Sequence, residues 1–141
     1  MSELYQRAVR LLARREHTRA ELTRKLAPYG NEDDIDTVLN ELARTGLQSD
    51  ARFAESYLRS QQGRLGTARL RQTLRTKGVD AELIAATVEE LPDEAGRIRG
   101  VWQKKFGTPP ADAREWARQA RFLQGRGFSV EMIRKLLKEQ E

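Results

Sequence analysis

Residues 49–78 read SDARFAESYLRSQQGRLGTARLRQTLRTKG, and this stretch predicts two short helices joined by a glycine-bearing turn. Ser49 and Asp50 are typical of a helix start, because their side-chain oxygens accept hydrogen bonds from first-turn amides. Thr67 is expected to cap the second helix in the same way. Gly78 ends that helix, since glycine adopts the left-handed conformation at little cost. The stretch therefore predicts an α-helical fold.

The same stretch is strongly basic. Between residues 51 and 77 there are seven Lys or Arg residues against one acidic residue, Glu55. Arg71 and Arg75 share one face of the second helix, because they lie four residues apart. A cationic face over a thin leucine seam indicates a surface that meets an anion, for which arginine offers a two-pronged contact. A solvated helix face is the alternative interpretation of these arginines.

Helical periodicity recurs along the whole chain, strand-like alternation is nearly absent, and one helical plan is repeated. At a shift of 48 residues, Leu22, Leu26 and Gly30 match Leu70, Leu74 and Gly78. At a shift of 49 residues, Leu74, Gly78, Ile84 and Val88 match Leu123, Gly127, Ile133 and Leu137. A chance origin of such apolar matching is the alternative to a true repeat of this period.

The repeat predicts an all-α protein of three tandem three-helix units, about nine helices in total. The expected boundaries are residues 1–48, 49–92 and 93–141. Units this small are stabilised by contacts with their neighbours. We therefore expect them to pack in series as one structural domain with an elongated, curved arrangement.

Charge follows the repeat, because the third helices of the first two units are acidic. Residues 31–50 carry one basic and six acidic residues, and residues 78–96 carry six acidic residues and no basic one. One interpretation is that these acidic helices pair with basic neighbours inside the molecule. The other is that basic faces line one side of the row of units and acidic faces the other.

Composition excludes several classes of function. The 141 residues carry a net charge of +5, which favours polyanionic partners, and include no cysteine and a single histidine, His17. Beside a predicted helix cap, His17 is expected to be a solvated turn residue. We find no catalytic constellation and no metal-ligand spacing, so the chain is predicted not to be an enzyme and to need no cofactor and no small-molecule substrate. No apolar run reaches the ~20 residues that span a bilayer.

Two segments of the chain carry distinctive motifs. The first is the pattern D-x-R-F-A-E-x-Y, followed by a glycine-bearing turn, a basic helix and a Leu-x₃-Gly ending; its residues are Asp50, Arg52, Phe53, Ala54, Glu55, Tyr57, Arg59, Gly66, Leu70, Leu74 and Gly78. The second segment is residues 121–129, RFLQGRGFS. Together they resemble the RecX family, bacterial regulators of the RecA recombinase. The resemblance implies three tandem three-helix units, in agreement with the internal repeat.

The resemblance also implies a function in DNA repair, recombination and the SOS response of a bacterial cytoplasm. The protein would bind the filament of RecA on single-stranded DNA and inhibit its recombinase, ATPase and coprotease activities. Double-stranded DNA stays open as a second partner, and no membrane is implied. The rival hypothesis is a helix-turn-helix-type DNA-binding module acting as a transcription regulator, although the acidic third helices suit neither groove of DNA.

The residues expected to bind the filament or DNA are Arg52, Arg59, Arg64, Arg69, Arg71 and Arg75, with Lys104, Lys105 and Arg126 as weaker candidates. Arg52 and Arg59 have a structural alternative, in which they pair with the acidic third helices. The aromatic residues are expected to pack in the core, with base stacking on single-stranded nucleic acid as the alternative for one or two of them.

Overall fold

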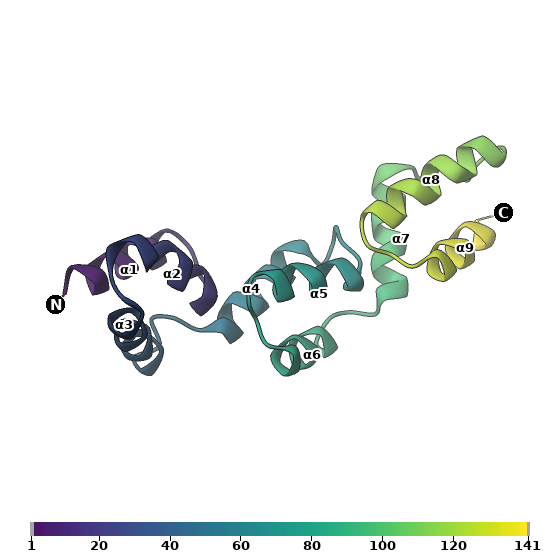
Figure 1. Cartoon of the computed structure of the whole chain (residues 1–141). Coiled ribbons are helices and arrows are strands. Elements are labelled where there is room, and N and C mark those ends of the chain that lie inside the picture. Colours follow the sequence, from purple (N-terminus) through teal and green to yellow (C-terminus); the bar gives the residue numbers. More distant parts are fainter. Residues whose placement is uncertain (1, 141) are drawn as a thin grey trace. The chain divides into compact units, whose positions relative to one another are not determined.

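The computed structural model describes residues 2–140, which form nine α-helices and one short 3₁₀-helix and contain no strand (Figure 1). The predicted all-α class is therefore confirmed. The helices are α1 (Glu3–Arg14), α2 (Arg19–Leu26), η1 (Ala27–Tyr29), α3 (Glu32–Arg44), α4 (Asp50–Gln61), α5 (Thr67–Thr76), α6 (Ala81–Glu89), α7 (Glu94–Lys105), α8 (Ala113–Gly125) and α9 (Val130–Glu139).

Contacts between residues divide the chain into two compact bodies. The first body comprises Met1–Ser56 and Leu74–Thr87, and the second comprises Tyr57–Thr73 and Val88–Glu141. Helices α4, α5 and α6 therefore contribute residues to both bodies. None of the helices within residues 2–140 combines the length and the apolar character that crossing a membrane requires.

The core of the first body lies between α1, α2 and α3. Its buried side chains are Ala8, Leu22, Leu26, Ile35, Val38, Leu39 and Leu42. A capping box begins α2: the Thr18 hydroxyl accepts from the Glu21 amide, and the Glu21 carboxylate accepts from the Thr18 amide, both at 3.0 Å. Asn31 caps α3 by accepting from the Asp34 amide at 2.8 Å.

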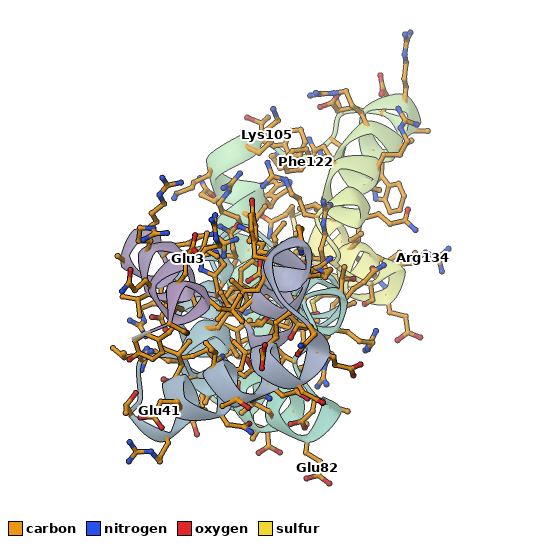
Figure 2. The ribbon with its side chains drawn as sticks, turned by 60° about the vertical axis from the view of Figure 1, so that its left-hand side comes forward. Glu3, Glu41, Glu82, Lys105, Phe122 and Arg134 are labelled. Carbon is orange, nitrogen blue, oxygen red and sulfur yellow. The ribbon has the colours of Figure 1, made fainter. Side chains whose placement is uncertain are left out.

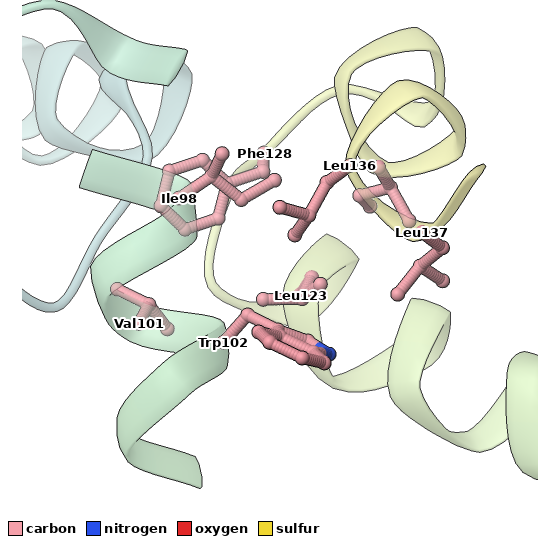
Figure 3. Close-up of a cluster of buried hydrophobic side chains, with 8 residues drawn as sticks. Ile98, Val101, Trp102, Leu123, Phe128, Leu136 and Leu137 are labelled. Carbon is pink, nitrogen blue, oxygen red and sulfur yellow. The ribbon is translucent and has the colours of Figure 1, made fainter. Parts of the chain in front are cut away.

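The core of the second body lies between α7, α8 and α9 (Figure 3). Its buried side chains are Ile98, Val101, Trp102, Leu123, Phe128, Ile133, Leu136 and Leu137. The Trp102 indole nitrogen donates to Gln119 Oε1 at 2.8 Å, so the one polar atom of this ring is satisfied inside the core. The core-packing interpretation is confirmed for Trp102 and Phe128.

Two local predictions are wrong. Thr67 is the first residue of α5 rather than its cap, because its amide donates to Glu94 Oε2 at 2.9 Å and its hydroxyl accepts from Arg97 at 2.5 Å. His17 is buried, with 2% of its surface exposed. Burial lowers the pKa of His17, and the neighbouring charges of Arg15 and Lys25 add to that effect.

In the first body, the start of α2 is joined to the end of α5. The Thr18 hydroxyl donates to the Lys77 carbonyl at 2.6 Å, and a Cβ placed on Gly78, whose φ is +91°, would overlap the Ala20 Cβ. The Glu21 carboxylate, 3% exposed, lies 3.5 Å from Lys77 Nζ and 3.0 Å from Arg15 Nη2. Burial opposes ionisation of Glu21, but these hydrogen bonds and charges outweigh it and lower its pKa to about 2.

The second body contains a similar close contact, or joint, between a helix start and a glycine, and its residues are shifted by 49 positions. Here Arg69 and Gly127 take the places of Ala20 and Gly78. A Cβ on Gly127 would overlap the Arg69 Cβ. The Gly66 amide donates to the Arg126 carbonyl at 2.7 Å. The buried Arg97 holds the same region from α7. Its guanidinium donates to the carbonyls of Pro92, Gln62 and Leu65 and to the Thr67 hydroxyl. The shift that relates the two joints equals one of the shifts seen in the apolar pattern.

Candidate partner and nucleic-acid interface

The Arg52 side chain makes hydrogen bonds that hold the first body together. Its Nε donates to Glu16 Oε2 at 2.5 Å, and its Nη1 and Nη2 donate to the carbonyls of Gly46 and Leu47 at 2.9 and 3.1 Å. These bonds tie the start of α4 to the α3–α4 connection and to the α1–α2 connection. The structural alternative for Arg52 is therefore supported, although its acidic partner lies outside the third helices.

Arg69 and Arg126 belong to the joint of the second body. Arg69 Nη1 donates to the Gly125 carbonyl, and the carbonyl of Arg126 accepts from the Gly66 amide. The backbone of residues 125–127 thus packs on the start of α5. The structure brings these two arginines together, but one donor of the Arg69 guanidinium is already bonded to a carbonyl of the protein itself.

The guanidinium groups of the other candidate arginines are not paired with acidic groups of the described residues. Arg59, Arg64, Arg71 and Arg75 form no ion pair or hydrogen bond through their side chains within residues 2–140. Arg71 is half-buried and the other three are exposed. Arg71 and Arg75 lie one turn apart on α5, so the predicted cationic pair exists on this helix. The pair is available to an external anion.

Two of the weaker candidates, Lys105 and Arg126, lie over one aromatic ring of the second body, Phe122. Lys105 Nζ lies 5.2 Å and Arg126 Cζ 4.9 Å from the centroid of Phe122 (Figure 2 labels Lys105 and Phe122). Phe106 meets Phe122 edge-on at a centroid separation of 5.5 Å. Distances of this size are typical of cation–π contacts, which orient the two cations without neutralising them. Lys104, next to Lys105, is exposed.

A groove of about 720 Å³ lies beside these rings, between the end of α7 and α8. Its basic lining residues are Lys105, Arg114, Arg118 and Arg121. Its acidic lining residues are Asp112 and Glu115, so the lining carries a positive excess. Glu115 accepts two hydrogen bonds from Arg118, at 2.7 and 2.9 Å, and these bonds, with one from Gln119, lower the Glu115 pKa to about 2.

The acidic helices are mostly unpaired. Within the described part of the chain, α3 makes one ion pair to another helix, between Asp36 and Arg19 at 3.6 Å. No acidic residue of α6 forms an ion pair within residues 2–140. Internal neutralisation therefore accounts for little of the acidic charge on these two helices.

Sequence reasoning missed the basic groove of the second body. Arg114, Arg118 and Arg121 recur at helical spacing along α8, and that spacing could have indicated one cationic face. It missed Arg97 as well, because nothing local distinguishes a buried arginine from an exposed one. No group of three or more His, Cys, Asp or Glu side chains suited to hold a metal ion occurs among residues 2–140.

Comparison with known families gives one consistent result. The models of the first, second and third three-helix domains of RecX match residues 5–42, 49–88 and 93–137. The predicted tandem organisation in three-helix units is therefore confirmed.

Several curated relatives, each named "Regulatory protein RecX", match nearly the whole chain. The relative from Leptothrix cholodnii is 46% identical over 134 residues, covering 94% of this chain and 85% of the relative. The relative from Chromobacterium violaceum is 47% identical over 132 residues, covering 93% and 86%. The relative from Pseudomonas entomophila is 48% identical over 134 residues, covering 92% and 86%.

Two solved structures share the fold. The crystal structure of RecX from Lactobacillus salivarius matches with a TM-score of 0.80 and 22% identity, covering 98% of this chain and 94% of that one. A crystal structure described as regulatory protein RecX matches with a TM-score of 0.79 and 21% identity, covering 97% and 72%.

Proposed function

The chain belongs to the RecX family of regulatory proteins, and from this premise we propose that it is a negative regulator of RecA. It binds the filament that RecA forms on single-stranded DNA and inhibits the recombinase, ATPase and coprotease activities of that filament. It acts in the bacterial cytoplasm by binding and catalyses no reaction. Binding that favours a less active state of the filament is sufficient for inhibition, because a ligand shifts an equilibrium by its differential affinity for the two states.

The observation that carries this proposal is the free cationic pair on α5. Arg71 and Arg75 have no acidic partner within residues 2–140, while the acidic residues of α6 are left unpaired as well. A protein that neutralised its own charges would bring these groups together. Charges left unpaired are instead suited to an external polyanion, to which arginine binds with paired hydrogen bonds.

The tandem arrangement of the units also suits a filament as the binding partner. Three successive three-helix units offer several weak contacts to a partner that is itself a repeat of identical subunits. Contacts linked in one chain add through effective concentration, so modest individual contacts give firm binding. Arg59 and Arg64, exposed and without a partner among the described residues, extend the set of free cations beyond α5.

The test is a titration of the protein into RecA turning over ATP on single-stranded DNA, at two salt concentrations. We expect saturable inhibition that weakens at the higher salt concentration, because each neutralised phosphate contributes to the salt dependence of binding. Unchanged ATP turnover at saturating protein would refute the proposal. Tight binding to a particular duplex sequence without any effect on RecA would favour the helix-turn-helix-type regulator instead.

A further inference from the structure

We propose that the groove between the end of α7 and α8 is a binding site for single-stranded nucleic acid, in which a base contacts Phe106 and the backbone phosphates contact Lys105, Arg114 and Arg121. This inference rests on the proposed function, since it assigns to one place on the chain a direct contact with the DNA strand.

The charge of the groove favours an anionic ligand. Lys105, Arg114 and Arg121 are exposed and form no ion pair within the part of the chain that the structure describes. Arg118 differs, because Glu115 holds it with two hydrogen bonds and its guanidinium lies 5.1 Å from the Phe106 ring centroid. Arg118 and Glu115 therefore form a charge-neutral pair in the wall of the groove. The other three cations outnumber the one remaining acidic residue of the lining, Asp112, which caps α8.

The spacing of these cations favours an extended anion over a single phosphate. Arg114 and Arg121 lie seven residues apart on α8, which is about 10 Å along the helix axis. Lys105 comes from a different helix, at the end of α7. Cations spread over this length and over two helices match successive phosphates of an extended chain better than one phosphate group.

The aromatic ring selects an unpaired base. Phe106 is half-buried, lines the groove, and is braced edge-on by Phe122 at 5.5 Å. The groove volume of about 720 Å³ lies in the range of pockets that hold ligands of nucleotide size. A base that is unstacked can contact the ring, while a base inside a duplex is already stacked and paired on both sides. Single strands are therefore favoured over duplexes.

The first experiment measures direct binding of the full chain, without RecA, by fluorescence anisotropy. The probes are a labelled oligothymidylate, an abasic deoxyribose-phosphate oligomer of the same length, and a duplex of the same length. We expect the wild-type protein to prefer the oligothymidylate over the abasic oligomer by about tenfold, because base–aromatic stacking is the difference between the two probes. Equal affinity of the wild-type protein for these two probes would overturn the inference.

The second experiment assigns this preference to the groove. Phe106→Leu keeps an apolar side chain against the core but removes the ring, so the preference should disappear while binding to the abasic oligomer is kept. A variant that melts at the wild-type temperature and keeps the preference would contradict the assignment to Phe106.

The third experiment uses exposed residues, whose replacement leaves the core intact. Lys105→Glu with Arg121→Glu should weaken binding to both single-stranded probes and reduce the salt slope by about 1.4. The matched control is Arg134→Glu with Lys138→Glu, two exposed cations on α9 that are unpaired within residues 2–140 and receive the same charge change. An equal loss of affinity in the control would show a net-charge effect and overturn the site.

The two proposals fail separately. A base preference that maps to the groove, without inhibition of RecA, contradicts the proposed function alone. Inhibition of RecA by a protein with no base preference contradicts only the inference about the groove.

Discussion

Gly66 and Gly127 lie in direct backbone contact in the second body. A Cβ on Gly66 would overlap the Gly127 carbonyl and lie 2.7 Å from the amide nitrogen of Phe128. The Gly66 amide donates to the neighbouring Arg126 carbonyl at 2.7 Å. Gly127 has a φ of +97°, a conformation that other residues rarely adopt. The joint therefore requires glycine on both sides, for two different reasons.

Gly66→Ala should destabilise the protein by about 3 kcal/mol, because the added methyl group meets rigid backbone rather than a side chain that can move. The measurement is urea denaturation followed by circular dichroism. Gly63→Ala is the matched control, since a Cβ at Gly63 meets nothing within 4 Å and its φ is not positive. Equal losses for the two variants would show that the Gly66 contact is not tight in solution.

Glu21→Gln should cost about 1–3 kcal/mol near neutral pH, because it leaves Arg15 and Lys77 without their buried negative partner. The pKa of Glu21 is about 2 in the folded protein and about 4.5 otherwise. The charged form is therefore favoured by folding, so its stabilisation is complete above about pH 4.5 and is lost as the pH falls toward 2.

The difference in unfolding free energy between wild type and Glu21→Gln should thus shrink as the solution is acidified. Denaturation curves of both proteins at several pH values measure this difference directly. Glu3→Gln serves as the control, because the Glu3 side chain is 84% exposed and its contact with Arg7 is 3.7 Å long. If the difference in unfolding free energy stays constant across the acid range, the ionised Glu21 carboxylate is not the source of this stabilisation.

Reversing Arg71 and Arg75 to Glu should weaken inhibition of RecA strand exchange by about tenfold or more, because two free cations become two charges that repel phosphate. The control is the double reversal of Arg10 and Arg14, which also lie one turn apart on one helix and form no ion pair among the described residues; both are exposed. Both variants change the net charge by the same amount. If the α1 variant inhibits as poorly as the α5 variant, the effect is one of net charge and not of α5.

Gly100→Ala should stabilise the protein by about 0.5–1 kcal/mol. Gly100 lies inside α7, is exposed, and a Cβ there meets nothing within 4 Å. Alanine loses less backbone entropy than glycine on entering a helix. A thermal melt is sufficient to detect the change, and a lower melting temperature would show that α7 does not tolerate a side chain at position 100.

Features that depend on neighbours in sequence could be predicted. The capping box of Thr18 and Glu21 and the apolar faces of α1–α3 follow from local hydrogen bonding and from the 3.6-residue period. The repeat of three-helix units was visible because the leucines and the glycine at the end of each unit's second helix recur at nearly constant spacing. These are the features for which short-range physics is sufficient.

Features that depend on distant partners could not be predicted. His17 is buried because α2 and the α3–α4 connection close over it, and the side chain of Gln48, from that connection, donates to its carbonyl at 3.3 Å. Thr67 was expected to cap α5, but Glu94 and Arg97 of α7 occupy its amide and hydroxyl. The sequence left a structural alternative open for Arg52 and Arg59 but not for Arg69. Only tertiary contacts separate Arg52 and Arg69, which bind carbonyls, from Arg71 and Arg75, which bind none.

Arg97 has a practical consequence for how the chain can be cut. It comes from α7, yet its guanidinium satisfies the carbonyls of Gln62 and Leu65 and the hydroxyl of Thr67, all of which precede it by thirty residues or more. A fragment that stops at Pro92 would leave these oxygens without their donor. Truncated versions intended for crystallisation or isotope labelling therefore need to extend beyond Arg97, even though the middle repeat ends several residues earlier.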